Sequence, residues 1–154
     1  MVGIIRRTAG AAWMTASFLS AACGPDSAPA RPELTVEDAW VRSVVAAETA
    51  ANTAAYLTIR NTGGAADRLI GARTDVAGMT EIHRTTIDST GLARMNRVDA
   101  IDLQPAAEVQ LEPGSYHLML MGVTRSLPVG DTVALALDFE TAGILEVTAE
   151  VRAF

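Results

Sequence analysis

Two histidines and a small group of methionines are the residues of this sequence with the clearest chemical potential. His83 and His117 are its only histidines, and Met95 lies between them. The second histidine opens the segment HLMLM, which also contains Met119 and Met121. Because side chains alternate between the two faces of a β-strand, His117 and these two methionines would share one face. The intervening leucines would face the core, so an imidazole and two thioethers would be presented together on the opposite face.

This combination of side chains favours a soft, monovalent metal ion. Thioethers are polarizable and uncharged, and they select Cu(I) over harder divalent ions, whereas imidazole binds either kind. A site of histidines and methionines also withstands an oxidizing compartment, in which thiolate ligands would form disulfides. The residue types therefore indicate a site for one Cu(I) ion in an exported protein.

Each candidate residue also has an ordinary structural interpretation. An isolated methionine such as Met95 usually fills a gap in the core, and Met119 alone could do the same. A single histidine is more often a surface or structural residue than a ligand. Met79 and Met121 are both better explained as structural residues, and Met121 is kept as a candidate auxiliary ligand. The combination of spacing, strand alternation and cellular compartment is what favours a shared metal site.

Short strands separated by turns would have to position these side chains. Apolar runs alternate with turn residues, which recur about every 8–15 residues. We expect strands at Leu34–Val41, Ala54–Arg60, Asp67–Arg73, Thr80–Ile87, Leu92–Val98, Glu108–Leu111, Tyr116–Val123, Thr132–Phe139 and Leu145–Val151. No stretch has a convincing helical period, although the alanine-rich residues 46–55 could form a helical turn. The pattern predicts an all-β single domain, built as an antiparallel sandwich or a Greek-key barrel.

One turn bears directly on the candidate site. Residues 88–91 read Asp-Ser-Thr-Gly, which predicts a hairpin between the runs that carry His83 and Met95. Pairing of these runs would bring the two side chains near each other. A neighbouring strand with His117 and Met119 would complete a set of four ligands, but the sequence leaves that adjacency open.

Charge and composition exclude several classes of function. The formal net charge is −6, the sequence contains no lysine, and its arginines are scattered. Nucleic-acid binding needs clustered cations, so this acidic chain does not fit it.

The single cysteine, Cys23, precedes the predicted domain. A blue copper electron-transfer site requires a cysteine ligand, and a catalytic zinc site requires three histidine or carboxylate ligands with an open water position. The predicted domain contains neither set of ligands, and we expect a protein that is not an enzyme.

The beginning of the chain has the pattern of an export segment. Arg6 and Arg7 precede a run of small and apolar residues that is too short and too rich in alanine for a membrane span. The sequence Leu-Ser-Ala-Ala before Cys23 resembles a bacterial lipoprotein signal, in which the cysteine becomes the lipidated first residue. Ordinary secretion, with cleavage near Ala22 or Ala30, is the alternative.

These features divide the chain into three parts. Residues 1–22 would be the export signal, and residues 23–33 would be a flexible tether rich in Pro, Ala and Gly. Residues 34–154 would form the metal-binding domain. The tether would allow a lipid-anchored domain to extend away from a membrane surface.

The spacing of the four candidate ligands resembles the signature of a known family. Twelve positions separate His83 from Met95, twenty-two separate Met95 from His117, and Met119 follows in a His-x-Met pair. This is similar to the periplasmic PCu(A)C copper chaperones, whose signature is His, an optional Met, ten residues, Met, twenty-one residues and His-x-Met. Five further segments resemble the family across residues 34–152, namely DAWVR at 38–42, AYLTI at 55–59, NTG at 61–63, ADRL at 66–69 and PGSYH at 113–117.

The resemblance implies a cupredoxin-like β-sandwich that holds one Cu(I) near its surface through His83, Met95, His117 and Met119. The implied role is to carry copper in the periplasm to a recipient protein, chiefly to assembly factors of cytochrome c oxidase. We expect a monomer that reaches the membrane only through lipidated Cys23. Copper storage or resistance without a dedicated client would use the same site, and a metal-free envelope protein is the further alternative.

One position departs from the family pattern. Arg84 occupies the place of the optional methionine, which removes a spare ligand and adds a cation beside the site. We expect this arginine either to weaken copper binding or to favour an acidic partner.

Overall fold

Ten β-strands in one sheet make up the described part of the chain. The computed structural model describes residues 30–45 and 51–154. The strands are β1 (Leu34–Arg42), β2 (Ala51–Asn61), β3 (Asp67–Arg73), β4 (Ala77–Ile87), β5 (Ala93–Arg97), β6 (Ile101–Leu103), β7 (Glu108–Leu111), β8 (Tyr116–Val123), β9 (Thr132–Phe139) and β10 (Gly143–Arg152). These described residues form no helix, and so contain none with the length and hydropathy of a membrane span.

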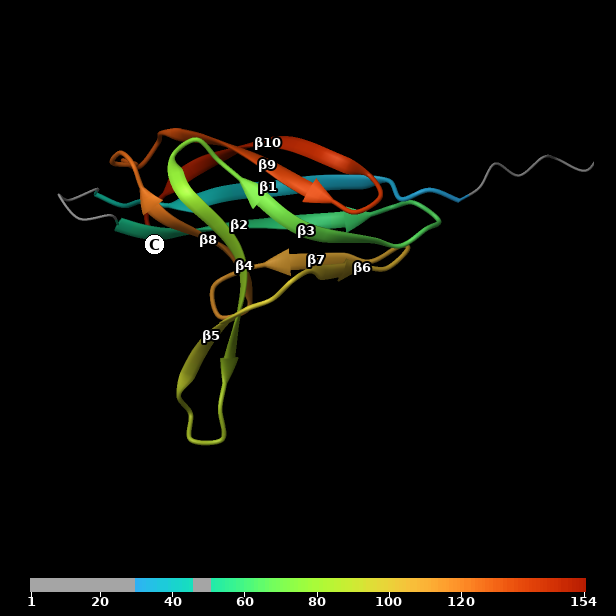
Figure 1. Cartoon of the computed structure of the whole chain (residues 1–154), viewed down its shortest axis with the longest axis horizontal. Coiled ribbons are helices and arrows are strands. Elements are labelled where there is room, and N and C mark those ends of the chain that lie inside the picture. The colour runs from blue at the N-terminus through green and yellow to red at the C-terminus, as the bar shows by residue number, and fades with distance from the viewer. Residues whose placement is uncertain (1–29, 46–50) are drawn as a thin grey trace, which may run out of the picture.

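The sheet is curved so that its two halves share one core. The strand order is β5-β4-β8-β7-β2-β1-β10-β9-β3-β6, and β8 also pairs with β2. Most neighbours are antiparallel, whereas β1 runs parallel to β10 and β7 runs parallel to β8. Figure 1 shows β1, β9 and β10 along the long axis of the body, with the β4–β5 hairpin projecting from it. The prediction of an all-β fold is confirmed.

Strict alternation of side chains explains why these residues form strands. In β9 every second residue is buried, namely Val133, Leu135, Leu137 and Phe139. Leu118 and Leu120 of β8 are fully buried and belong to the same apolar cluster. The two leucines of the segment HLMLM therefore face the core, as their spacing predicted, and they fix the outward direction of the residues between them.

The structure contains each of the nine predicted strands, with bounds that differ by up to three residues. It adds β6, whose three residues are too few to show a period. The helical turn predicted for residues 46–55 is wrong over 51–55, because these residues begin β2 and pair with β8. Pairing with a neighbouring strand overrides the helix propensity of alanine there. Residues 46–50 lie outside the described part.

The predicted hairpin between β4 and β5 is also present. Thr85 pairs with Met95, and the turn between the strands is built by Asp88. The Asp88 carboxylate accepts hydrogen bonds from the hydroxyl of Thr90 and from the amides of Thr90 and Leu92. These bonds, led by the Thr90 hydroxyl, lower the pKa of Asp88 from 3.8 to about 2. Gly91 closes the turn with a φ of 83°, a conformation that favours glycine.

The predicted export signal and Cys23 lie outside the described residues. The end of the predicted tether, in contrast, lies against the domain. The amide of Glu33 donates to the Asn61 side chain, and the carbonyl of Glu33 accepts from the amide of Thr62. A Cβ added at Gly63 would overlap the carbonyl oxygen of Arg31, so this approach requires glycine.

Candidate metal centre

The register of neighbouring strands brings the two histidines together. His83 of β4 lies directly opposite His117 of β8, with ring centroids 5.8 Å apart and an interplanar angle of 63°. On the other side of β8, Tyr56 of β2 lies 6.3 Å from the His117 ring, and Trp40 of β1 packs on Tyr56 at 4.5 Å. This row of rings across four strands holds both imidazoles on the outer face of the sheet.

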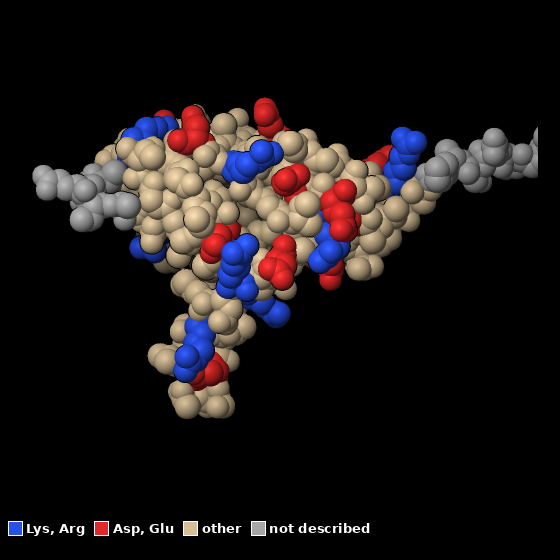
Figure 2. All heavy atoms as spheres, viewed as in Figure 1, with Lys and Arg blue, Asp and Glu red and all other residues tan. Residues whose placement is uncertain are grey.

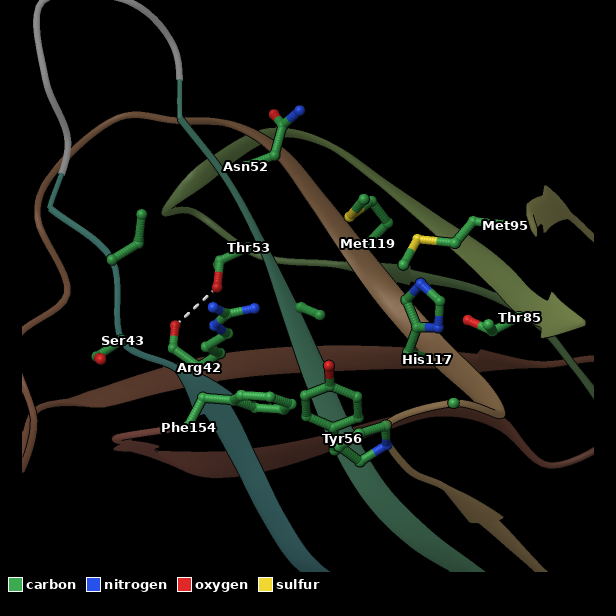
Figure 3. A pocket seen from close by; sticks show the side chains of 14 residues that line it. Arg42, Ser43, Asn52, Thr53, Tyr56, Thr85, Met95, His117, Met119 and Phe154 are labelled. Atoms are coloured by element: carbon green, nitrogen blue, oxygen red, sulfur yellow. Dashed lines mark hydrogen bonds between the residues drawn. The ribbon is translucent and has the colours of Figure 1, made fainter. Parts of the chain in front are cut away.

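Both predicted methionine ligands lie on the same side as the histidines. Met119 follows His117 by two residues and has the small side chain of Ala54 beside it on β2. Met95 lies on β5 opposite Thr85, and 60% of its surface is exposed. Figure 3 shows the Met95 thioether extending toward the His117 ring, with the Met119 thioether nearby. The sequence had left the adjacency of these strands open, and the structure provides it.

A surface cavity of about 400 Å³ lies between these side chains. Its lining includes Met95, His117 and Met119, with Tyr56 and Thr85 beside them (Figure 3). His83 does not line this cavity, although its ring packs against His117. Three of the four predicted ligands therefore converge on a space that opens to solvent. The fourth, His83, packs its ring against that of His117.

His117 is held as a neutral ring with one free nitrogen. Only 3% of the residue is exposed, and its Nδ1 lies 3.2 Å from the carbonyl oxygen of Ser115. A carbonyl can only accept, so Nδ1 carries the proton and Nε2 keeps its lone pair. Burial lowers the pKa of His117, the bond to Ser115 opposes that change, and the nearby His83 adds to it. An imidazole kept neutral in this way is ready to bind a metal ion.

His83 has one bonded and one unsatisfied ring nitrogen. Its Nε2 lies 2.9 Å from a carboxylate oxygen of Glu81, whereas its Nδ1 is buried without a hydrogen-bond partner. Nδ1 is the one such side-chain atom recorded within residues 30–45 and 51–154. Buried polar atoms are nearly always satisfied, so an exception of this kind calls for an explanation. A metal ion would supply the missing partner.

The donors of this region are soft and uncharged. Across the described ranges, no three His, Cys, Asp or Glu side chains converge as a metal site. A structural or catalytic zinc site would need such a cluster. Two imidazoles with two thioethers instead match the preference of Cu(I).

Comparison with known proteins places the chain in a family. The family model described as "Putative lipoprotein LpqE-like" matches residues 34–151. This chain belongs to the LpqE-like group of the PCuAC family. The LpqE-like chain is 26% identical over 119 residues to "Putative lipoprotein Lxx21020" of Leifsonia xyli subsp. xyli, a match that covers 77% of this chain and 69% of that protein.

Solved structures similar to the LpqE-like chain include copper-loaded proteins. The copper-bound PCuAC domain from PmoF2 is 29% identical, with a TM-score of 0.65, over 79% of this chain and 93% of that domain. The solution structure of CuI-DR1885 from Deinococcus radiodurans is 33% identical, with a TM-score of 0.61, over 82% of this chain and 83% of that one. These neighbours establish the fold and family of the LpqE-like chain.

The two remaining methionines of the domain lie two residues further along β4 and β8 than the pair formed by Glu81 and Met119. Met121 pairs with Met79 across β8 and β4. Because a strand advances by about 3.3 Å per residue, Met121 lies roughly 13 Å along β8 from His117. Neither methionine lines the cavity. Their placement outside the cavity agrees with the structural interpretation that the sequence suggested for both methionines.

Sequence reasoning missed two residues that shape this centre. Tyr56 packs beside His117, and Glu81 binds His83. The rule that grouped His117 with Met119 could have found Glu81, because it precedes His83 by two positions and so shares its face. Tyr56 gave no comparable signal, since its proximity depends on the pairing of β2 with β8. Arg84, the departure from the family signature, lies with its guanidinium over the Tyr116 ring, 5.1 Å from the centroid.

Proposed function

We propose that this protein is a copper chaperone of the bacterial cell envelope. It binds one Cu(I) through His83, Met95, His117 and Met119 and passes the ion to a recipient protein, which serves the assembly of the copper centres of cytochrome c oxidase. The strongest support is that Met95, His117 and Met119 converge on one cavity, with His83 packed against His117, in a fold whose relatives include copper-bound domains.

The exposure of the site supports transfer of the ion rather than permanent retention. Met95 is exposed on a projecting hairpin, whereas His117 is buried in the body of the sheet. A recipient's ligand can therefore approach from the side of Met95 and replace this thioether first. The imidazoles would hold the ion until the recipient supplies further ligands. Neutral, exchangeable donors of this kind permit such an intermediate without charge repulsion.

Charges of both signs lie on the hairpin beside the site. Figure 2 shows acidic and basic side chains interspersed over the visible face. On the hairpin Arg94 pairs with Asp88, and Arg97 pairs with Glu81. Shape and ligand exchange, more than long-range attraction, would then select the recipient.

Export and lipid anchoring complete the proposal. Residues 1–22 would direct export, and lipidation of Cys23 would tether the domain to a membrane, in keeping with the lipoprotein description of the family. Mass measurement of the protein purified from membranes tests this. A diacyl modification on Cys23 is expected, and Cys23→Ser should release the domain in soluble form. A soluble wild-type protein that begins near Ala30 would contradict the anchor.

The metal site is tested by competitive Cu(I) titration of the exported domain under reducing, oxygen-free conditions. The wild type is expected to bind one equivalent. The variant His117→Ala/Met119→Ala should lose that binding, because it removes two of the four donors. Met79→Leu is the matched control, since this exposed methionine lies on β4 outside the cavity. Unchanged binding in the double variant would exclude the proposed ligand set.

Transfer separates a chaperone from a storage or resistance protein. The copper-loaded protein is mixed with an excess of a metal-free recipient domain from an oxidase assembly factor, and the copper content of each is measured after separation. Movement of copper faster than its spontaneous release supports chaperone function. Retention of copper, with normal oxidase activity in cells that lack the protein, would favour storage.

A further inference from the structure

The carboxylate of Glu81 lies beside the proposed site and contacts one of its histidines. Glu81 lies on β4 two residues before His83, and 19% of its side chain is exposed. One carboxylate oxygen lies 2.9 Å from Nε2 of His83, and the other lies 3.3 Å from the Arg97 guanidinium of β5. Arg97 is the residue directly opposite His83 in the β4–β5 pair. The three side chains therefore form a chain of contacts from Arg97 through Glu81 to His83.

The direction of the hydrogen bond follows from the chemistry of the partners. A carboxylate that also pairs with an arginine has no proton to donate, so Nε2 of His83 must be the donor. In a neutral ring the proton on Nε2 leaves the lone pair on Nδ1. That atom is the buried nitrogen without a partner in the described residues. One contact therefore explains both why Nε2 is occupied and why Nδ1 is free.

His117 has the opposite arrangement. Its Nδ1 donates to the carbonyl of Ser115, so its lone pair is on Nε2. Each histidine thus has one nitrogen engaged by a fixed acceptor and one nitrogen left bare. Metal-binding histidines usually donate their second N–H to a carboxylate or a backbone carbonyl, which fixes the ring and makes the bound nitrogen more basic. Glu81 and the Ser115 carbonyl are one example of each kind.

We propose that Glu81 is a positioning residue for the metal site, and that Cu(I) is bound by Nδ1 of His83 and Nε2 of His117. This inference rests on the proposed copper function and makes it more specific. Glu81 fixes the tautomer of His83, and Arg97 holds Glu81 in place. The carboxylate also brings a negative charge close to a monovalent cation whose four ligands are neutral.

The same contact has a second reading with the opposite consequence. If Cu(I) used Nε2 of His83, Glu81 would compete with the metal for that nitrogen, and removing the carboxylate would strengthen binding. The bare, buried Nδ1 favours the positioning role, because competition would leave this atom unsatisfied in both states. The sign of the change in affinity therefore separates the two readings.

Long-range proton–nitrogen NMR of the two imidazoles tests the tautomers in the metal-free protein. His83 is expected to carry its proton on Nε2 and His117 on Nδ1. On addition of Cu(I), the largest nitrogen shifts should fall on Nδ1 of His83 and Nε2 of His117. A proton on Nδ1 of His83, or a copper-dependent shift that is larger at its Nε2 than at its Nδ1, would overturn the proposal.

Cu(I) affinities of Glu81 variants provide the second test. Glu81→Ala is expected to weaken binding by about 10- to 100-fold, the usual cost of removing such a partner. Glu81→Gln should retain most of the affinity, because its amide oxygen still accepts from Nε2. Glu108→Ala is the matched control, since it removes an exposed carboxylate that pairs with Arg60 and has no contact with either histidine. Unchanged or tighter binding by Glu81→Ala would contradict the positioning role.

The outcomes also distinguish this inference from the proposed function. If the wild type bound no Cu(I), the copper function would fail, while the metal-free NMR spectrum would still report the tautomers. If the wild type bound Cu(I) but the shifts fell on Nε2 of His83, the copper function would stand and the role of Glu81 would fail.

Discussion

Two regions of this molecule bury polar side chains, and they treat them differently. At the end of the domain away from the hairpin, Asn61 is fully buried and Asp67 is 3% exposed. Asn61 accepts from the amides of Glu33 and Gly63 and donates to the carbonyls of Ala65 and Leu103. We call Asn61 and Asp67 the loop anchor, because their bonds tie the loops together.

Asp67 is satisfied as fully as Asn61. Its carboxylate accepts hydrogen bonds from the amides of Arg68, Thr141 and Ala142, at 2.7 to 2.8 Å. Two of these amides are more than seventy residues away in the sequence. The loop anchor therefore joins the start of β3 to the turn between β9 and β10.

The histidine pair is the contrasting region. His117 is as buried as Asp67, yet its ring makes one protein hydrogen bond, and His83 leaves Nδ1 without any. A residue kept for stability alone would be expected to satisfy its polar atoms, as the loop anchor does. The loop anchor is therefore satisfied within the protein, whereas the histidine pair leaves ring nitrogens without protein partners, as the proposed metal site requires.

The largest effect is expected from breaking the loop anchor. Asp67→Ala removes the buried carboxylate that accepts from three backbone amides, so the free energy of unfolding should fall by about 3 kcal/mol. Urea unfolding of the metal-free protein measures this. Cu(I) binding by the fraction that remains folded should be unchanged, because Asp67 is not part of the metal site.

Asp102→Ala is the control for this comparison. It removes the same charge from an exposed carboxylate that pairs with Arg68. Its effect should lie within about 0.5 kcal/mol, as is usual for exposed ion pairs. Equal losses in the two variants would mean that charge rather than buried hydrogen bonding accounts for the role of Asp67.

The second largest effect is a loss of stability that appears only when copper is present. His83→Leu replaces an incompletely bonded ring by an apolar side chain, so the metal-free stability should change by less than about 1 kcal/mol. With free Cu(I) at a hundred times its dissociation constant, the wild type should gain about 2.7 kcal/mol and the variant nothing. Thermal unfolding with and without Cu(I) measures both quantities. A large loss of stability without metal would mean that His83, like Asp67, mainly stabilises the fold.

Local patterns predicted much of this molecule. Alternation around Leu118 and Leu120 indicated both the strand and the outward direction of His117 and Met119. The turn residues from Asp88 to Gly91 predicted the β4–β5 hairpin, because each supplies a property that the turn requires. The family signature indicated four candidate ligands, which strand pairing places near one another, and their binding of a metal stays a prediction.

Features that depend on distant pairing were not predictable. The neighbourhood of β4 and β8 joins segments more than thirty residues apart, and alternation within either strand carries no information about its partner. The alanines that begin β2 have a local preference for helix, which pairing with β8 overrides. The contact between Glu81 and His83 is local in sequence, but its meaning depends on the buried, unpartnered Nδ1, which only the packed structure shows.

A third prediction concerns the two methionines. Met95→Leu and Met119→Leu keep the apolar volume and remove the sulfur, so each should change the metal-free stability by less than about 1.5 kcal/mol. Both should weaken Cu(I) binding, because each removes one soft donor. Met121→Leu should bind Cu(I) like the wild type, since Met121 does not line the cavity. Competitive Cu(I) titration of the three variants measures these differences. Weaker binding by Met121→Leu would instead make this residue an auxiliary ligand.

The smallest effect is expected at Asp88, and it separates the contribution of hydrogen bonding to stability from that of burial. Like Asp67, Asp88 accepts backbone amides, but it lies in a partly exposed turn. Its pKa is lowered to about 2, so its stabilising contribution is present above its ordinary pKa of 3.8 and is lost as the pH falls toward 2. Asp88→Asn cannot titrate, so the wild type should be slightly more stable than this variant near neutral pH, and the difference should disappear at about pH 2. Urea unfolding at several pH values measures it. A difference as large as that for Asp67→Ala would mean that the number of hydrogen bonds, and not their burial, decides stability in this fold.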